Sequence, residues 1–137
     1  MNAKNKTASG LLYFVSFLCI IISLVYLFTP VILPYHVRFL GKTHNQLDQK
    51  TAQLLIYALR IIGGATLSIG IVLAILVKQM FSGLKWIRWT IFIMMTIMLG
   101  TCVYVMLNVG LFTPWWIIVI AYFITCTGLL LAGSDEK

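Results

Sequence analysis

The residues best suited to binding chemistry lie between Gln53 and Gly64. Gln53, Tyr57 and Arg60 recur at helical spacing, so a helix places an amide, a phenol and a guanidinium along one face. A guanidinium beside hydroxyl groups can hold a phosphate or a carboxylate through two parallel hydrogen bonds. The spacing predicts an anion site, and the alternative is that Arg60 only extends its charged end into the membrane interface.

A second polar group lies upstream, in the segment 29–50 that contains Pro30 and Pro34. These prolines end one helix and bias Leu33 toward extended backbone, while the apolar residues around them suit a membrane interface. If the segment folds back over the helix that carries Arg60, five side chains converge on one polar mouth. The predicted ligand-binding residues are Tyr35, His36, Arg38, Tyr57 and Arg60.

Thiol chemistry and metal binding find less support. The three cysteines, at positions 19, 102 and 126, fall within apolar stretches and none belongs to a C-x-x-C pair, which favours helix packing over thiol–disulfide exchange. His36, His44 and Asp48 offer at most three metal ligands on a loop. We therefore expect no metal site and no cofactor.

The composition sets the class of protein that must position these residues. Of 137 residues, 61% are hydrophobic and 9% are charged, against about 25% charged in an ordinary soluble domain. The mean hydropathy of +1.02 excludes a soluble globule and predicts an all-α membrane protein. The net charge of +7 then favours membrane orientation and anionic lipid headgroups as its role, not nucleic-acid binding.

Four long apolar stretches, each near the roughly 20 residues that cross a bilayer, predict a bundle of four transmembrane helices in one membrane domain, 1–137. The predicted spans are 11–28, 52–77, 87–108 and 114–132. The segment 29–50 is the long connection, and we expect it to lie along the outer interface. Asn45 or Asp48 can cap the second helix, which should be the longest, and Thr113 with Pro114 can begin the last.

The distribution of Lys and Arg predicts that both termini are cytoplasmic, because basic loops resist translocation. Six basic residues fall on the side of the termini: Lys4, Lys6, Lys78, Lys85, Arg88 and Lys137. Three fall on the opposite side: Arg38, Lys42 and Lys50.

Small residues recur at spacings that let helices approach closely. We expect packing at Gly63, Gly64, Thr66, Gly70, Ala74, Gly100 and Gly128. Packing within one chain is the first interpretation, and a homodimer or a larger membrane complex is the alternative. Gly63 and Gly64 could also leave room for an acyl chain beside the backbone, one turn from Arg60.

The tripeptide Pro34-Tyr35-His36, the stretch Ala58-Leu59-Arg60-Ile61-Ile62-Gly63-Gly64 and the following Gly70 resemble a pattern in small four-helix inner-membrane proteins of bacteria, and more loosely in DoxX-like families. The similarity covers about a third of the chain. It implies a bacterial cytoplasmic membrane protein with several spans. It carries over no activity and no catalytic residue.

The cores of the spans contain no Asp, Glu, Lys, Arg or His, and such groups are what ion-coupled transporters use. The sequence therefore favours a non-enzymatic membrane protein, either an accessory subunit or a binder of lipid or another amphiphile, with membrane lipids as partners. One alternative is a small permease or flippase for an amphiphile. The other is a membrane enzyme with an outer-surface site built from His36, His44, Asp48 and Arg60.

Overall fold

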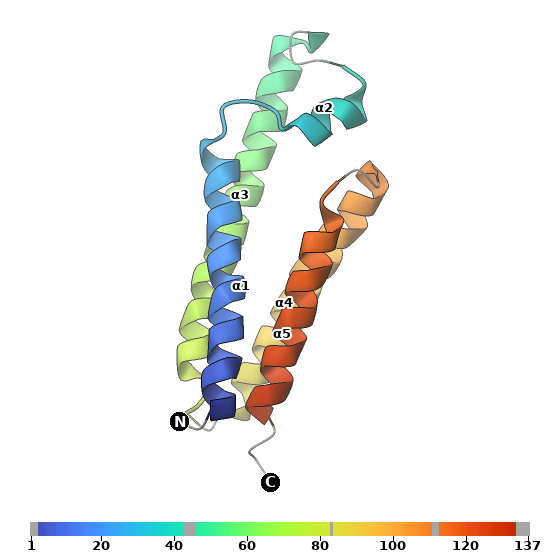
Figure 1. Cartoon of the computed structure of the whole chain (residues 1–137). Helices are drawn as coiled ribbons and strands as arrows, with labels where there is room; N and C mark the ends of the chain where they lie inside the picture. The colour runs from blue at the N-terminus through green and yellow to red at the C-terminus, as the bar shows by residue number, and fades with distance from the viewer. Residues whose placement is uncertain (1–2, 43–45, 83, 111–112, 134–137) are drawn as a thin grey trace.

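The computed structural model describes residues 3–42, 46–82, 84–110 and 113–133, which form five helices and no strand (Figure 1). The helices are α1 (Ala3–Phe28), α2 (Pro34–Leu40), α3 (Gln49–Gln79), α4 (Lys85–Val109) and α5 (Trp115–Gly133). All except α2 are long and apolar enough to cross a membrane. The predicted fold class is confirmed: the chain is an all-α, multi-pass membrane protein.

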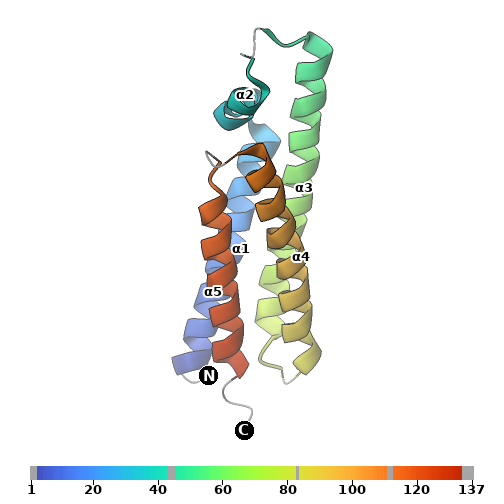
Figure 2. The ribbon, with the colours of Figure 1, turned by 90° about the vertical axis from the view of Figure 1, so that its right-hand side faces the viewer.

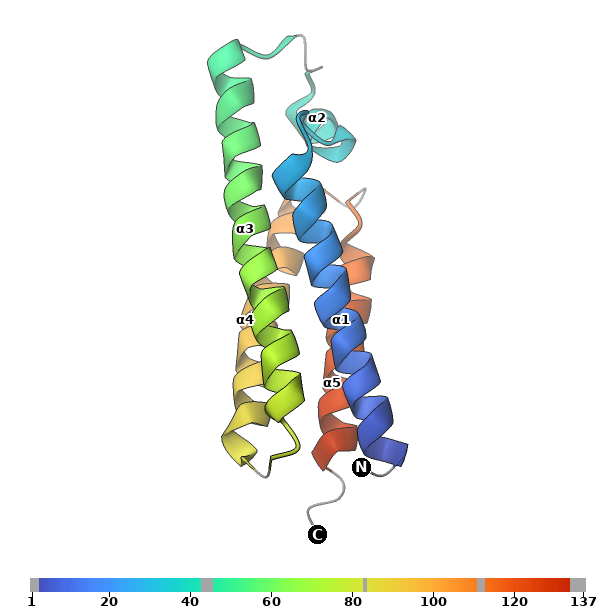
Figure 3. The ribbon, with the colours of Figure 1, turned by 90° about the vertical axis from the view of Figure 1, so that its left-hand side faces the viewer.

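The four long helices alternate in direction, so the start of α1 and the end of α5 lie at the same end of the bundle (Figure 1). The connection from α3 to α4 is also at this end, which we call the terminal end. The short helix α2 and the connection from α4 to α5 lie at the opposite end, which we call the α2 end (Figure 3). Which end faces the cytoplasm stays a prediction.

Helix α1 begins at Ala3, eight residues before the predicted span, because its first turns have a packing partner. Ala8 and Leu12 are fully buried, and both lie against Gly128 of α5. The segment that carries Lys4 and Lys6 is thus helical from residue 3 onward. Helix α3, with 31 residues and a length of about 46 Å, is the longest, as predicted, and exceeds a hydrocarbon core of about 30 Å.

The segment 29–50 contains a helix that the sequence did not predict. Leu33 has extended backbone, as expected before proline, and Pro34 then occupies the first turn of α2, where its missing N–H costs nothing. Gly41 ends the helix with a φ of 63°, a left-handed conformation that glycine adopts easily. Asp48 caps α3 by accepting the backbone N–H of Thr51 at 3.2 Å, as predicted, and Asn45 lies outside the described residues.

The expected start of the last helix at Thr113 is wrong in its detail. The buried hydroxyl of Thr113 donates to the carbonyls of Met106, at 3.1 Å, and Gly110, at 2.8 Å. It therefore satisfies carbonyls at the end of α4, which the helix itself leaves unpaired, and does not cap α5. Helix α5 begins at Trp115, immediately after Pro114.

The core lies toward the terminal end, where all four long helices meet. Its largest fully buried apolar side chains are Leu12, Val15, Leu73, Val77, Ile87, Ile91 and Met95. Helix α4 contributes no buried residue beyond Leu99, and α3 rises past the ends of α4 and α5 (Figure 2). Toward the α2 end, the close packing is therefore that of α1 on α3.

Helices α1 and α3 meet along a seam of serines and glycines with the same seven-residue spacing. The Ser16 hydroxyl donates to the carbonyl of Gly70 at 2.7 Å, in a buried position. One heptad further along α1, the Ser23 carbonyl lies 3.0 Å from where a Cβ on Gly63 would stand. Small residues thus bring the two backbones together, as is usual between membrane helices.

Candidate functional site

The polar residues that share one face of α3, Gln53, Tyr57 and Arg60, line a small cavity near the α2 end. Gln53, Ile56, Tyr57 and Arg60 form its wall with Pro30, and its volume is about 180 Å³. The Cζ atom of Arg60 lies 5.9 Å from the centre of the Tyr57 ring, within the range of a cation–π contact. The helical spacing seen in the sequence therefore produces a cluster with one cation, one phenol and one amide.

This cluster lies beside the face of α3 that packs on α1. Ala52, Leu59 and Gly63 are the buried residues of α3 nearest to this cluster in the sequence, and Gly63 lies against α1. Tyr57 is 55% exposed and Arg60 is exposed, so the guanidinium does not turn into the bundle. The Arg60 guanidinium lies over the Tyr57 ring, so its positive charge is at a surface that an anion can reach.

The residues of α2 form a separate cluster with the end of α1. The Tyr26 and Tyr35 hydroxyl oxygens are 2.5 Å apart, and the rings of Tyr35 and His36 have centres 4.2 Å apart. The Nδ1 atom of His36 is buried without a hydrogen-bond partner in the described structure. Burial lowers the pKa of His36, and burial together with the Tyr26 hydroxyl raises the pKa of Tyr35.

Four of the five predicted ligand-binding residues thus fall into two groups, Tyr57 with Arg60 and Tyr35 with His36. Among the described residues, no hydrogen bond or ring contact joins one group to the other. Arg38 is exposed on α2. The convergence of all five on one mouth stays a prediction.

Sequence reasoning missed three contributors to these clusters. Ile56 and Pro30 line the Arg60 cavity, and Tyr26 holds Tyr35. Ile56 could have been found, because it lies one turn before Arg60 on the same helix. The partners of Pro30 and Tyr26 depend on how the chain turns between α1 and α3, and no local pattern encodes that turn.

The small residues predicted to pack helices occupy three kinds of position. Gly63 and Gly70 lie against α1, and Gly128 lies against Leu12, with neighbours 2.9 to 3.2 Å from a hypothetical Cβ. Gly64 and Gly100 have open space within 4 Å at that point. Thr66 and Ala74 are half-buried, and the Thr66 hydroxyl donates within its own helix, to Ile62.

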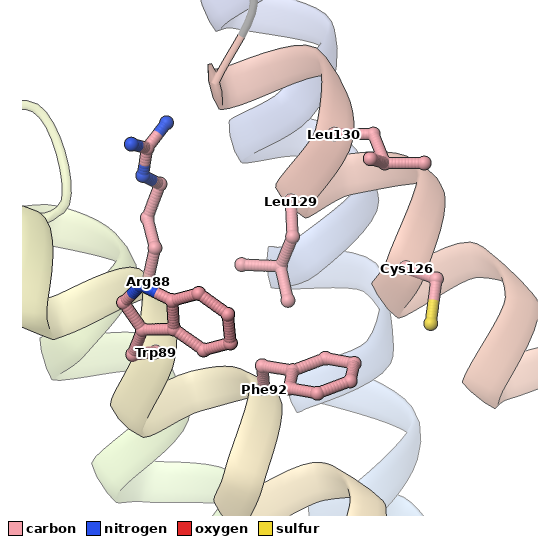
Figure 4. A pocket seen from close by; sticks show the side chains of 6 residues that line it. All are labelled: Arg88, Trp89, Phe92, Cys126, Leu129 and Leu130. Carbon is pink, nitrogen blue, oxygen red and sulfur yellow. The ribbon is translucent and has the colours of Figure 1, made fainter.

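A larger cavity, of about 460 Å³, lies between α4 and α5 near the terminal end (Figure 4). It is lined by Arg88, Trp89, Phe92, Cys126, Leu129 and Leu130. The sequence analysis used Arg88 only as a charge for orientation. Pairing of the first turns of α4 with the last turns of α5 creates this groove, and that pairing is visible only in the fold.

The other candidate chemistry is sparse in the described part of the chain. No three His, Cys, Asp or Glu side chains among the described residues come close enough to hold a metal ion, and His44 lies outside those residues. Cys19 is buried, and Cys102 and Cys126 are half-buried. All three are free thiols.

Compared with protein-family models, with curated proteins and with solved structures, the chain matches none. The features of the molecule that bear on its function are the geometry of the two cavities and the distribution of charge.

Proposed function

We propose that the protein is a non-enzymatic, multi-pass protein of the bacterial cytoplasmic membrane that binds the anionic headgroup of a lipid or another amphiphile at Arg60. The observation that carries the proposal is the placement of the exposed Arg60 guanidinium over Tyr57, at a cavity that Gln53 also lines. A guanidinium can pair with two oxygens of a phosphate or carboxylate, while the phenol and the amide can donate further hydrogen bonds.

The size of the cavity indicates which part of an amphiphile it holds. At about 180 Å³ it is smaller than the roughly 300 to 1,000 Å³ of pockets that enclose a whole small molecule. It suits a headgroup whose tail stays in the bilayer. Gly64 lies one turn further along the same face with open space around it, and Ile61 is 74% exposed, so an acyl chain can run along α3 there.

The charge distribution supports an outward orientation of this site. Five of the six basic residues assigned to the terminal end lie on described helices: Lys4, Lys6, Lys78, Lys85 and Arg88. An excess of Lys and Arg marks the cytoplasmic side of a membrane protein. In this orientation the α2 end and Arg60 lie at the outer leaflet. Membrane lipids are then the expected partners of the site. This holds equally if the protein is a subunit of a larger membrane complex.

Cysteine accessibility tests the orientation. A cysteine in place of Asn45 should react with an impermeant thiol reagent in intact cells, and one in place of Ser82 only after lysis. The three native cysteines are replaced by alanine in both variants, so that one site reports each time. Labelling of the residue-82 variant in intact cells would reverse the assignment.

Substitution of Arg60 tests the binding itself. Phosphatidylglycerol should raise the melting temperature of the wild type in neutral detergent more than that of Arg60→Lys or Arg60→Ala, because an ammonium keeps the charge but loses the planar pair of donors. Lys50→Ala removes an exposed charge from the same helix and is the matched control. Equal lipid-dependent shifts for the wild type and both Arg60 variants would mean that Arg60 only reaches into the interface.

A further inference from the structure

The polar side chains at the Arg60 cavity follow one another along α3. Gln53 lies nearest to the start of the helix, Tyr57 follows about one turn later, and Arg60 lies closest to the core. At about 1.5 Å per residue, the levels of Gln53 and Arg60 along the helix axis differ by about 10 Å. The exposed Ile61 and the open space at Gly64 come next. A lipid with its tail along Ile61 and its phosphate at Arg60 therefore extends its headgroup toward Tyr57 and Gln53.

The charge at the cavity matches one negative charge. Among the described residues that line it, Arg60 alone is a cation, and the exposed Lys50 does not belong to the lining. One guanidinium pairs with two oxygens and balances a single negative charge, which is the charge of a phosphodiester. A phosphate monoester carries about 1.5 to 2 negative charges at neutral pH, so part of its charge would stay unbalanced here.

The cavity has no feature that holds an ammonium group. The Arg60 guanidinium lies 5.9 Å from the centre of the Tyr57 ring, so this face of the ring already holds a cation. Asp48, the acidic residue nearest to Arg60 in the sequence, caps α3 at Thr51 and does not line the cavity. The ammonium of an ethanolamine or choline headgroup would therefore meet the like charge of Arg60 with no carboxylate to balance it.

Gln53 and Tyr57 are placed to contact the alcohol of a headgroup. Both are exposed, and no side chain in the described part of the chain forms a hydrogen bond with the Gln53 amide or the Tyr57 hydroxyl. An amide and a phenol can each donate to and accept from a hydroxyl group. A headgroup with hydroxyl groups can thus pair with both side chains, and a headgroup without them cannot.

We propose that the Arg60 cavity selects a phosphodiester with one negative charge, whose headgroup alcohol carries hydroxyl groups and no ammonium. The inference rests on the proposed function and adds the chemical class of the headgroup. Phosphatidylglycerol has this chemistry, and so has the soluble compound glycerophosphoglycerol. The lipid is the favoured source, because its acyl chain can also lie along Ile61 and Gly64.

Dissociation constants of dioctanoyl lipids, measured by titration calorimetry on the full-length protein in neutral detergent, test the selection. Phosphatidylethanol has the same charge as phosphatidylglycerol but no headgroup hydroxyl. Phosphatidylglycerol should bind about fivefold more tightly, which corresponds to about one net hydrogen bond. Phosphatidylethanolamine should bind more weakly than either. Equal affinities for phosphatidylglycerol and either of the other lipids would overturn the class, and equal affinity for glycerophosphoglycerol would overturn the lipid as its source.

Two variants assign the preference to the side chains. Tyr57→Phe keeps the ring beneath Arg60 and removes the hydroxyl, and Gln53→Leu removes the amide. Each should lower the fivefold preference for phosphatidylglycerol, while the affinity for phosphatidylethanol stays unchanged. Lys50→Ala, outside the cavity lining, should leave both affinities as in the wild type. A preference that survives both variants would contradict the assignment.

Arg60→Gln separates this inference from the proposed function. It should weaken the binding of phosphatidylglycerol and phosphatidylethanol alike, because both phosphates meet the guanidinium. If the two lipids bind the wild type equally and both depend on Arg60, the proposed function holds and the class of headgroup is wrong. If Arg60→Gln changes neither affinity, the binding site at Arg60 is itself wrong and the class falls with it.

Discussion

The two ends of the bundle differ in how many helices share the packing. At the terminal end, side chains from α1, α3, α4 and α5 form one core, and Ile87, Ile91 and Met95 of α4 are completely buried in it. Toward the α2 end, α1 and α3 are held by the approach of their backbones at Gly63. The terminal end is thus built as a scaffold, and the α2 end leaves polar side chains at an open surface.

This difference explains where a ligand can bind. A membrane helix packs through van der Waals contact and hydrogen bonds, because lipid tails are as apolar as leucine. Where all four long helices pack together, the side chains between them are buried. Where α3 rises past α4 and α5, the face that carries Tyr57 and Arg60 is exposed.

The largest effect is expected from closing the seam between α1 and α3. Gly70→Leu places a side chain where a Cβ already meets the Ser16 carbonyl at 3.2 Å and the Cys19 Cβ at 3.2 Å, so the helices must separate. We expect a loss of about 3 kcal/mol in the free energy of unfolding. Unfolding by sodium dodecyl sulfate in mixed micelles measures it.

Gly64→Leu is the matched control, because the Cβ position of Gly64 has open space within 4 Å. Its unfolding should follow that of the wild type. Similar losses for the Gly64 and Gly70 variants would show that the distinction between packed and open faces of α3 is wrong.

The next effect compares the core with the open surface. Ile91→Ala, at a fully buried position, should cost about 2 kcal/mol, the low end of the usual range because lipid is as apolar as the core it replaces. Ile61→Ala, at a position 74% exposed, should cost much less. Thermal unfolding of both variants in the same detergent measures the two losses of stability. Equal losses would mean that the core is not concentrated at the terminal end.

A smaller effect is expected from the hydrogen bond between α1 and α3. Ser16→Ala removes the bond to the Gly70 carbonyl, and such bonds in membrane proteins contribute about 0.6 kcal/mol. Ser68→Ala removes a bond within α3 itself, to the Gly64 carbonyl, and should leave the contact between α1 and α3 unchanged. A larger loss of stability for Ser68→Ala than for Ser16→Ala would show that the Ser16 hydrogen bond does not hold α1 against α3.

The smallest effect is local to α2 and depends on pH. Burial lowers the pKa of His36 when α2 is docked, so the docked state favours neutral histidine. The ordinary pKa of histidine is about 6.5, and above this pH docking of α2 is at full strength. As the pH falls below it, docking weakens, because His36 binds a proton more readily when α2 is released than when it is docked. In a His44→Gln background, amide hydrogen exchange of α2, corrected for intrinsic rates, should quicken at pH 5.5.

His36→Gln should abolish that dependence on pH. If exchange of α2 in the His36→Gln variant still quickens at pH 5.5, another group controls the docking.

The spans could be predicted from sequence because their signal is local. Apolar runs of sufficient length, Asp48 at a helix start and the extended Leu33 before proline each depend on neighbours in the chain. The early start of α1 could not be predicted, since it depends on Ala8 and Leu12 meeting Gly128, more than 110 residues away. Helix α2 was missed because its seven residues are too few to show a hydrophobic period.

The candidate sites divide in the same way. The contact between Arg60 and Tyr57 follows from spacing on one helix and could be expected. The Tyr26–Tyr35 pair and the Arg88 groove each join two elements, and their geometry depends on how those elements pack. The sequence therefore identified the residues of one helix face but could not place the second element beside it.

Photo-crosslinking tests the central claim, that the open face of α3 binds an anionic headgroup. The protein is reconstituted with phosphatidylglycerol that carries a diazirine near its headgroup, and mass spectrometry identifies the crosslinked residues. We expect crosslinks concentrated on Gln53, Tyr57 and the neighbouring turns of α3, and a marked decrease in Arg60→Gln but not in the control Lys50→Gln. Crosslinks spread evenly around α3, or unchanged by Arg60→Gln, would contradict the claim.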